Sequence, residues 1–92
     1  MRFEFKPSFD RSIKSLTESE KADVKEVASK MIDILSMDRQ IHQGIGLKRL
    51  RADFWEARKG IKVRILFRWK GDLVEFVLAG SHDDVKRFLK NI

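Results

Sequence analysis

Apolar and polar residues alternate over the first seven positions of the chain. From Phe9 onward, the apolar residues instead recur with the period of a helix. Phe3 and Phe5 alternate with charged residues until Pro7 ends the run, which predicts a short strand with one apolar face. Ser8 is a candidate N-cap for a short helix. Behind it, apolar residues recur at i, i+4 and i+7, as expected for one side of a helix: Phe9, Ile13 and Leu16.

A second, longer helix is predicted directly after the first. Thr17 and Glu20 have the spacing of a capping box, in which each side chain binds the backbone of the other residue. The apolar stripe that follows is Val24, Val27, Ala28, Met31, Ile34 and Leu35. Two helices in succession predict a helical hairpin.

The next segment, 38–46, loses this periodicity and is expected to be a loop. Three runs of alternating residues then follow, separated by glycines at hairpin spacing, and they predict three strands. The third run is the most apolar, so we expect it to be the central strand. The strands are predicted over Phe54–Lys59, Val63–Trp69 and Leu73–Ala79.

A last helix is expected after Ser81, a candidate N-cap, with Val85, Phe88, Leu89 and Ile92 on its apolar side. The predicted order is β-α-α-β-β-β-α, which indicates an α+β fold. Consecutive hairpins favour an antiparallel sheet, with the N-terminal helical hairpin packed on one face and part of the other face open. At 92 residues, we expect one domain spanning 1–92.

Positive charge is concentrated in one region. Residues 47–70 contain nine Lys or Arg against only Asp53 and Glu56, a formal net charge of +7, whereas the whole chain carries +6. In Val63–Trp69 one face is apolar and the other carries cations. A field this local favours a surface that binds a polyanion such as nucleic acid. The alternative is a solvated sheet face in a basic protein.

Several chemistries are not expected. The chain has no cysteine, which excludes disulfides, thiolate metal sites and a Cys nucleophile. His42 has no second ligand at metal-binding spacing, and Asp83 and Asp84 fit the first turn of a helix, where they oppose the macrodipole. We therefore expect no metal and no cofactor. With Glu4 near the start and no long apolar run, we expect neither a signal peptide nor a membrane span, and a cytoplasmic location.

Taken together, the order of elements and a series of short motifs resemble the RelE/ParE toxins of bacterial type II toxin–antitoxin systems. The motifs correspond in order and spacing to the sequence motifs of that family, which are L-K-x-L, W-E-x-R, x-R-I-L-Y/F and G-x-H/R. The resemblance covers nearly the whole chain. It is carried by Ser8–Phe9, Leu47–Leu50, Phe54–Arg58, Val63–Phe67 and Val77–Asp83.

The resemblance implies a microbial-RNase-like fold and a cognate antitoxin as partner. It also implies one of two targets. RelE-like members are metal-independent endoribonucleases that cut mRNA, usually on the ribosome, whereas ParE-like members act on DNA gyrase through protein contacts. The RelE-like branch is favoured here. The alternatives are a ParE-like gyrase inhibitor and a non-catalytic relic that binds antitoxin or RNA.

Catalytic residues follow from the resemblance. Arg58 and Arg64 correspond to strand arginines around the scissile phosphate, and His82 to a catalytic histidine of some members. Arginine suits the phosphate because its planar fork is always charged, and histidine suits proton transfer near neutral pH. Glu56 is a conceivable second proton-transfer group. Many RelE-like nucleases use a tyrosine near the C-terminus, but this chain has none; Phe88 can stack but cannot transfer a proton.

Aromatic, apolar and basic residues are the remaining candidates for binding. Trp55, Phe67 and Trp69 share the inward side of their strands, so we expect them in the core rather than in a base-stacking platform. The apolar side of the last helix either covers the sheet or is displaced, and it is predicted to contribute to an antitoxin groove through Val85, Phe88 and Leu89. The residues predicted to hold the RNA backbone or ribosomal RNA are Lys48, Arg49, Arg51, Lys59, Lys62 and Arg68.

Overall fold

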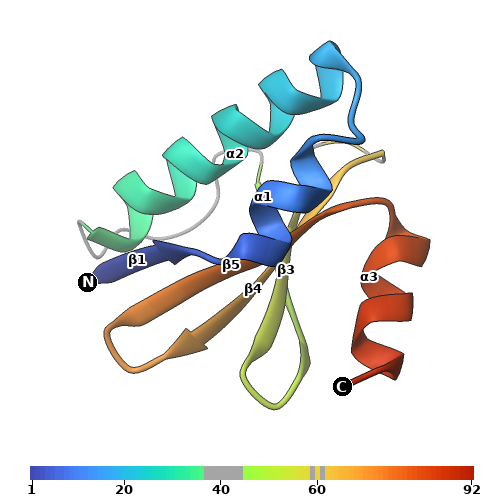
Figure 1. Ribbon diagram of the computed structural model, residues 1–92. Coiled ribbons are helices and arrows are strands. Elements are labelled where there is room, and N and C mark those ends of the chain that lie inside the picture. Colours follow the sequence, from blue (N-terminus) through green and yellow to red (C-terminus); the bar gives the residue numbers. More distant parts are fainter. Residues whose placement is uncertain (37–44, 59, 61) are drawn as a thin grey trace.

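The computed structural model describes residues 1–36, 45–58, 60 and 62–92. In these residues three helices surround one five-stranded sheet (Figure 1). The elements, in chain order, are β1 (Arg2–Phe5), α1 (Pro7–Ile13), α2 (Glu18–Ser36), β2 (Gly46–Arg51), β3 (Phe54–Arg58), β4 (Arg64–Lys70), β5 (Leu73–Gly80) and α3 (His82–Lys90).

The α+β fold class is confirmed, but the sheet differs from the prediction in two ways. Its strand order is β1-β5-β4-β3-β2. Strands β3 to β5 form the expected antiparallel hairpins and β2 adds a further antiparallel one, whereas β1 pairs with β5 in parallel, so the sheet is mixed. Parallel pairing is possible because the chain between β1 and β5 contains α1, α2 and three strands, far more than the minimum connection that parallel strands require. The expectation that Leu73–Ala79 forms the central strand is wrong: β4 is central and β5 lies next to it, between β4 and β1.

Strand β2 was not predicted from the sequence. Its residues lie at the edge of the sheet, where only one side of the strand is paired, and its register with β3 shifts between Arg49 and Arg51. This irregularity breaks the two-residue alternation by which a strand is recognised. Of the segment expected to be a loop, 38–44 lies outside the described residues and Gly46 already belongs to β2.

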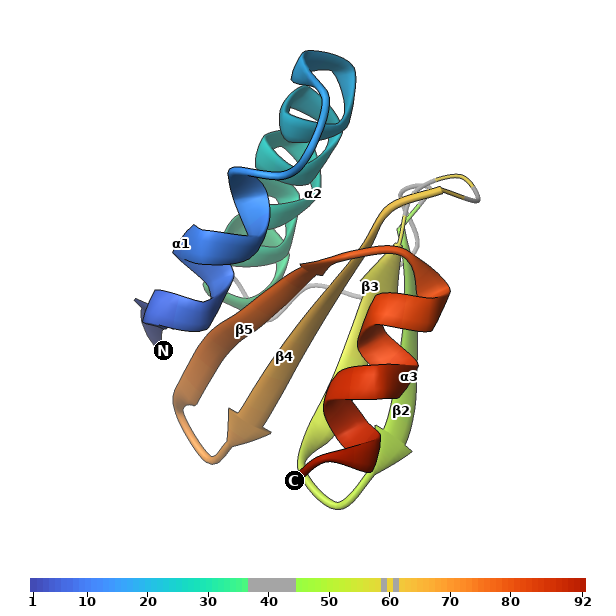
Figure 2. The same ribbon diagram turned by 45° about the vertical axis from the view of Figure 1, so that its right-hand side comes forward.

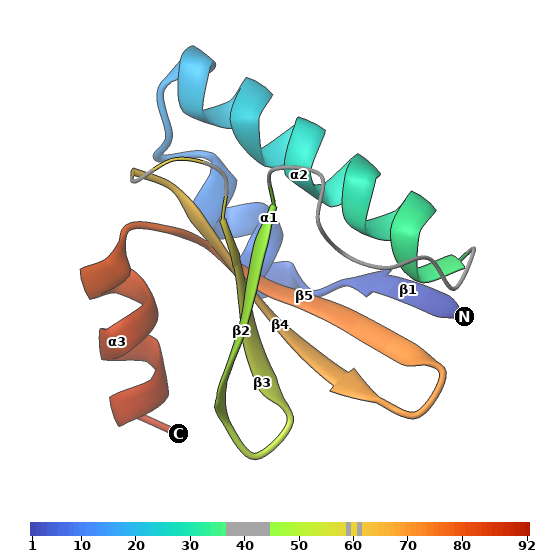
Figure 3. The ribbon, with the colours of Figure 1, turned by 180° about the vertical axis from the view of Figure 1, so that it is seen from behind.

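The main core lies between the sheet and the helical hairpin of α1 and α2, which covers one face (Figures 1 and 3). The α2 capping box is confirmed: Thr17 N donates to Glu20 Oε1 at 2.9 Å, and Glu20 N donates to Thr17 Oγ1 at 3.1 Å. As expected, Trp55, Phe67 and Trp69 pack into this core. Its fully buried members include Met31, Ile65, Phe67, Val74 and Phe76.

Helix α1 continues the edge of the sheet where β1 ends. Strand β1 pairs only with Leu73–Phe76 of β5. Beyond that point Ser8 Oγ donates to the carbonyl of Val77 at 2.5 Å, and Ser12 Oγ accepts from the amide of Ala79 at 2.9 Å. The prediction that Ser8 caps α1 is therefore wrong: Lys6 is the N-cap, and the Ser8 hydroxyl satisfies β5 instead.

Helix α3 packs on the opposite face of the sheet, over a smaller apolar cluster (Figure 2). Val85 is buried there against Leu66 and Val77. The predicted cap is confirmed, because Ser81 and Asp84 form a complete capping box. No helix in the described part of the chain is long and apolar enough to cross a membrane.

Candidate functional site

The site that concentrates predicted functional residues is a small cavity where α3 begins. It has a volume of about 180 Å³. Strands β2, β3 and β4 and the first residue of α3 line it, so four elements meet there. The three predicted catalytic residues lie together in this lining. The full set is Gly46, Leu47, Lys48, Glu56, Arg58, Arg64 and His82.

Strand register explains why the two arginines meet. Arg58 of β3 lies directly opposite Arg64 of β4, so both side chains are on the same face of the sheet. The same row continues to Gly46 on β2 and Gly80 on β5. Two like charges held side by side favour an anion between them.

Arg64 already has a resident counter-ion. Its Nε lies 3.1 Å from Oε1 of Glu56, and the two side chains are only 13% and 8% exposed. Glu56 also lies opposite Lys48 of β2 in the cross-strand register. The cationic face predicted for Val63–Trp69 indicated an anion from outside the chain, but Glu56 already provides an internal counter-ion for Arg64. The carboxylate fixes one edge of the Arg64 guanidinium and therefore its orientation.

His82 is positioned by the cap of α3. It is the first residue of the helix and is exposed to solvent. Ser81 N donates to Asp84 Oδ2 at 2.9 Å, and Asp84 N donates to Ser81 Oγ at 3.1 Å. These hydrogen bonds from Ser81, with a smaller contribution from Arg87, lower the pKa of the Asp84 carboxyl. The reciprocal bonds hold the start of α3, and with it His82, against the sheet.

Gly80 is required by the same arrangement. A Cβ at this position would lie 2.7 Å from Oδ2 of Asp84 and 3.0 Å from its Cβ. Real Cβ atoms do not come this close, so any other residue would displace the Asp84 carboxylate from its cap. Glycine here serves close approach and not an unusual backbone angle.

The cavity carries excess positive charge. Lys48, Arg58 and Arg64 oppose the single carboxylate of Glu56. Fixed cations beside an imidazole are the groups needed to bind a phosphate and move a proton near it. Among the described residues, no cluster of three or more His, Cys, Asp or Glu is arranged to hold a metal ion.

The other residues predicted to bind RNA do not form one patch. Arg49 donates from Nε to the carbonyl of Ala52 at 2.9 Å, and Arg51 is exposed at the β2–β3 hairpin. Arg68 is half-buried: it lies 3.7 Å from Glu75 and 4.0 Å from Asp53, and its guanidinium lies over the ring of Phe54. Lys62 is exposed on the rim of a different cavity, and Lys59 lies outside the described residues.

The residues predicted to bind an antitoxin cover the sheet in this structure. Val85 is 3% exposed, and Phe88 and Leu89 are half-buried in the same cluster. A larger cavity of about 590 Å³ lies between α1 and α3, and Phe88 contributes to it. Of the two arrangements considered for the last helix, the structure has the one in which its apolar side packs on the sheet.

Sequence reasoning missed three features of the site. Gly46 and Gly80 end the arginine row, and Glu56 is bound to Arg64 and not left available. A signal for Glu56 was present, because it shares a strand face with Arg58. The pairing of β3 with β4 was also predicted, but the register that brings Glu56 to Arg64 was not readable from the glycine spacing alone.

No family model and no curated protein sequence matches the chain. Solved structures do match. A metal-bound toxin from Helicobacter pylori is 20% identical, with a TM-score of 0.72 over 92% of this chain and 98% of that chain. RelE, in the RelB–RelE antitoxin–toxin complex from Methanococcus jannaschii, is 13% identical, with a TM-score of 0.72 over 92% and 96%. YafQ, in the DinJ–YafQ complex from E. coli, is 15% identical, with a TM-score of 0.71 over 92% and 98%. The chain has the fold of these toxins.

Proposed function

We propose, from the premise that the chain has the fold of RelE-type toxins, that it is the toxin of a type II toxin–antitoxin system and a metal-independent endoribonuclease of mRNA. The observation that carries the proposal is the gathering of Arg58, Arg64 and His82 around one small cavity with excess positive charge. Residues from three separate elements meet there, and each has the chemistry that RNA cleavage requires.

The proposed reaction is an internal transesterification. The ribose 2′-hydroxyl loses its proton and attacks the adjacent phosphorus, the bond from phosphorus to the 5′-oxygen breaks, and that oxygen takes up a proton. The products are a 2′,3′-cyclic phosphate and a 5′-hydroxyl end. Charge accumulates on the phosphoryl oxygens during the attack, so fixed cations stabilise the transition state more than the substrate.

Arg58 is assigned the main contact to the phosphate. Its side chain is exposed beside the cavity, and it stands opposite Arg64 in the strand register. Arg64 contributes from the wall of the cavity, in the orientation set by Glu56. Planar guanidinium groups bind phosphate oxygens in pairs, which fixes the phosphate for in-line attack.

His82 is assigned the proton transfer. It is exposed and lies at the mouth of the cavity with its backbone held by the α3 cap. Glu56 is assigned a positioning role and not that of the base, because its carboxylate is nearly buried and ion-paired to Arg64. Among the described lining residues this leaves His82 as the proton-transfer group, with solvent water as the carrier for the second proton.

The proposed partner is an antitoxin whose acidic segment covers the basic side of the cavity. An antitoxin partner is supported by the similar structure from Methanococcus jannaschii, which is an antitoxin–toxin complex of RelB and RelE. An mRNA target, whether free or on the ribosome, requires a cytoplasmic location. Val85, Phe88 and Leu89 remain the predicted antitoxin contacts if α3 moves off the sheet.

The test is induced expression followed by mapping of mRNA 5′ ends within minutes. Wild type is expected to create new 5′-hydroxyl ends and arrest growth. Arg58→Ala and His82→Ala should each reduce the ends by about 100-fold or more, the usual cost of losing one such group. Lys70→Ala is the matched control, since Lys70 is an exposed cation of the same basic region outside the cavity lining, and it should cleave like wild type.

Other outcomes would identify the alternatives. Growth arrest with intact mRNA and an induced DNA-damage response would overturn the nuclease and indicate a DNA gyrase inhibitor. Intact mRNA with normal growth would indicate a non-catalytic module that binds antitoxin or RNA.

A further inference from the structure

We propose that a basic track beside the cavity, formed by Lys48 and Arg51 of β2 and Lys86 and Lys90 of α3, binds the phosphates of the RNA that flank the cleaved one. The inference rests on the proposed function, because it takes the cavity as the place of the scissile phosphate. It adds two lysines of α3 that lie outside the basic region of residues 47–70.

The two cavities show which side of α3 faces β2. His82 lines the small cavity together with Gly46, Leu47 and Lys48 of β2. On the other side of the helix, Asp84, Arg87 and Asn91 line the larger cavity towards α1. Lys86 and Lys90 follow His82 at steps of four residues, and residues four apart lie on the same side of a helix. Lys86 and Lys90 therefore lie on the side of α3 that faces β2 or at the solvent-exposed border of that side.

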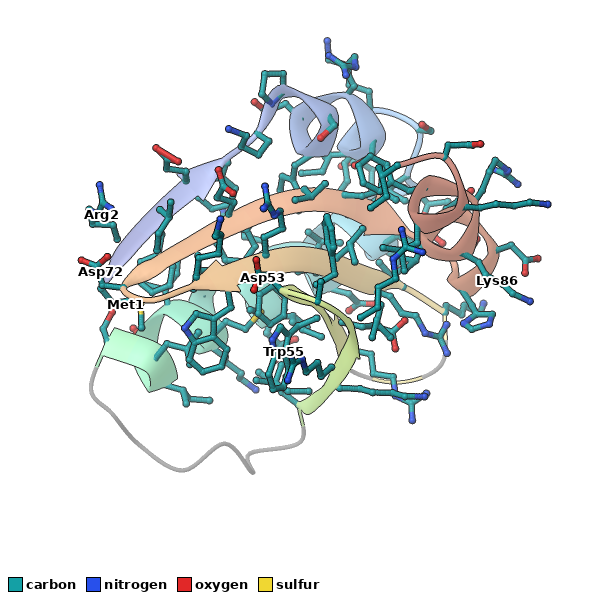
Figure 4. The ribbon with its side chains drawn as sticks, turned by 90° about the horizontal axis from the view of Figure 1, so that it is seen from below. Met1, Arg2, Asp53, Trp55, Asp72 and Lys86 are labelled. Atoms are coloured by element: carbon teal, nitrogen blue, oxygen red, sulfur yellow. The ribbon has the colours of Figure 1, made fainter. Side chains whose placement is uncertain are left out.

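The helix and the strand run alongside each other. In Figures 1, 2 and 3 the C-terminal end of α3 lies near the β2–β3 hairpin, and His82 lines the cavity where β2 begins. Both elements therefore run from the cavity towards the hairpin. Leu50 of β2 and Leu89 of α3 belong to the same apolar cluster, which joins the two elements beneath the cations. Figure 4 shows Lys86 at the end of the sheet far from Arg2 and Asp72.

The cations of the track are not neutralised within the described chain. Lys48, Arg51, Lys86 and Lys90 are all exposed, and none takes part in an ion pair found among the described residues. Arg68, in contrast, is shared between Asp53 and Glu75. A surface of exposed cations next to the cavity lined by Arg58 and Arg64 has a strong local attraction for a polyanion.

The spacing favours an extended single strand. Lys86 and Lys90 are one helical turn apart, about 6 Å along the axis, and Lys48 and Arg51 are about 10 Å apart along β2. Steps of this size suit successive phosphates of a strand lying between two rows of cations. The track is continuous with the cavity, so an RNA whose scissile phosphate lies in the cavity would enter the track directly. An acidic protein segment could bind these cations without occupying the cavity.

The experiment measures binding by fluorescence anisotropy, with the full chain and uncleavable 2′-O-methyl RNA as probe. Two lengths are compared, a long unstructured RNA and a trinucleotide. The track variant is Lys86→Gln/Lys90→Gln. The matched control is Lys14→Gln/Lys25→Gln, which removes the same charge from exposed residues at the end of α1 and on α2, in the layer behind the sheet.

The track variant is expected to bind the long RNA roughly 3- to 10-fold more weakly than wild type, and the slope of log affinity against log salt should fall by about 0.7 for each lysine removed. Binding of the trinucleotide, and all binding by the control variant, should be unchanged. Equal losses for both RNAs, equal losses for both variants, or weakened binding of an acidic peptide with unchanged RNA binding would each overturn the track. Because the probe cannot be cleaved, a failure of the nuclease proposal would appear separately, in the mapping of mRNA ends.

Discussion

The pair formed by Glu56 and Arg64 sets the chemistry of the cavity at the scale of single residues. A buried carboxylate 3.1 Å from the guanidinium compensates its charge and determines which edge faces the cavity. The alternation of β4 predicted that Arg64 would face away from the core, and it does. The counter-ion was not predicted, because it depends on the cross-strand register, which local pattern does not contain.

Removing Glu56 should destabilise the protein. Glu56→Ala leaves Arg64 as an unpaired charge that is only 13% exposed, so the free energy of unfolding should fall by about 3 kcal/mol in urea denaturation. Glu56→Gln should cost less, because its amide keeps the shape of the carboxylate and places an oxygen beside the Arg64 guanidinium. Glu18→Ala is the control: Glu18 pairs with Lys21 while 94% exposed and should have almost no effect. Equal losses for Ala and Gln at position 56 would contradict the ion-pair account.

At the scale of elements, the capped N-terminus of α3 determines the position of His82. The N-cap Ser81 was predicted, because a cap is local in sequence, whereas Asp84 was assigned to the first turn of the helix and its part in a capping box was not predicted. In contrast, β2 was missed because its irregular register hides the two-residue period, and Ser8 was misassigned because its partner, Val77, is distant in sequence.

The cap should make stability depend on pH in a defined direction. The pKa of Asp84 is lowered below its ordinary 3.8 by hydrogen bonds from Ser81. A lowered pKa in the folded state means that the stabilisation is present above the unfolded pKa and is lost as the pH falls through the folded value. Asp84→Ala should therefore cost about 1 kcal/mol at neutral pH. The difference from wild type should shrink in strong acid, as measured by urea denaturation; an unchanged difference would contradict this role.

Gly80 should tolerate no side chain, although its backbone is ordinary. In Gly80→Ala the new Cβ would meet Oδ2 of Asp84 at 2.7 Å and expel the carboxylate from the cap. The stability loss should therefore equal or exceed that of Asp84→Ala, and cleavage should fall as His82 shifts. Gly46→Ala is the matched control, because its Cβ would meet Arg58 Cγ at an ordinary 3.6 Å. Similar melting temperatures for the two variants would refute the close-approach argument.

At the scale of the whole molecule, the site lies where strand ends and a helix start converge. The sheet brings Arg58 and Arg64 into one row, and the turn from β5 into α3 places His82 beside them. The α+β class, the helical hairpin and the sheet face on which the arginines lie could be predicted from the sequence, because these follow from periodicity. It did not predict the parallel pairing of β1 with β5, which closes the far edge of the sheet through contacts distant in sequence.

The central claim is that this cavity cleaves RNA without a metal. The most direct measurement adds the purified chain to a translating cell-free extract with a known mRNA. The 3′ ends of the fragments are then identified by mass spectrometry, because a 2′,3′-cyclic phosphate is the product of the proposed transesterification. We predict 2′,3′-cyclic phosphate ends with wild type and their loss with Arg58→Ala. Intact mRNA, or fragments that persist unchanged with Arg58→Ala, would contradict the account.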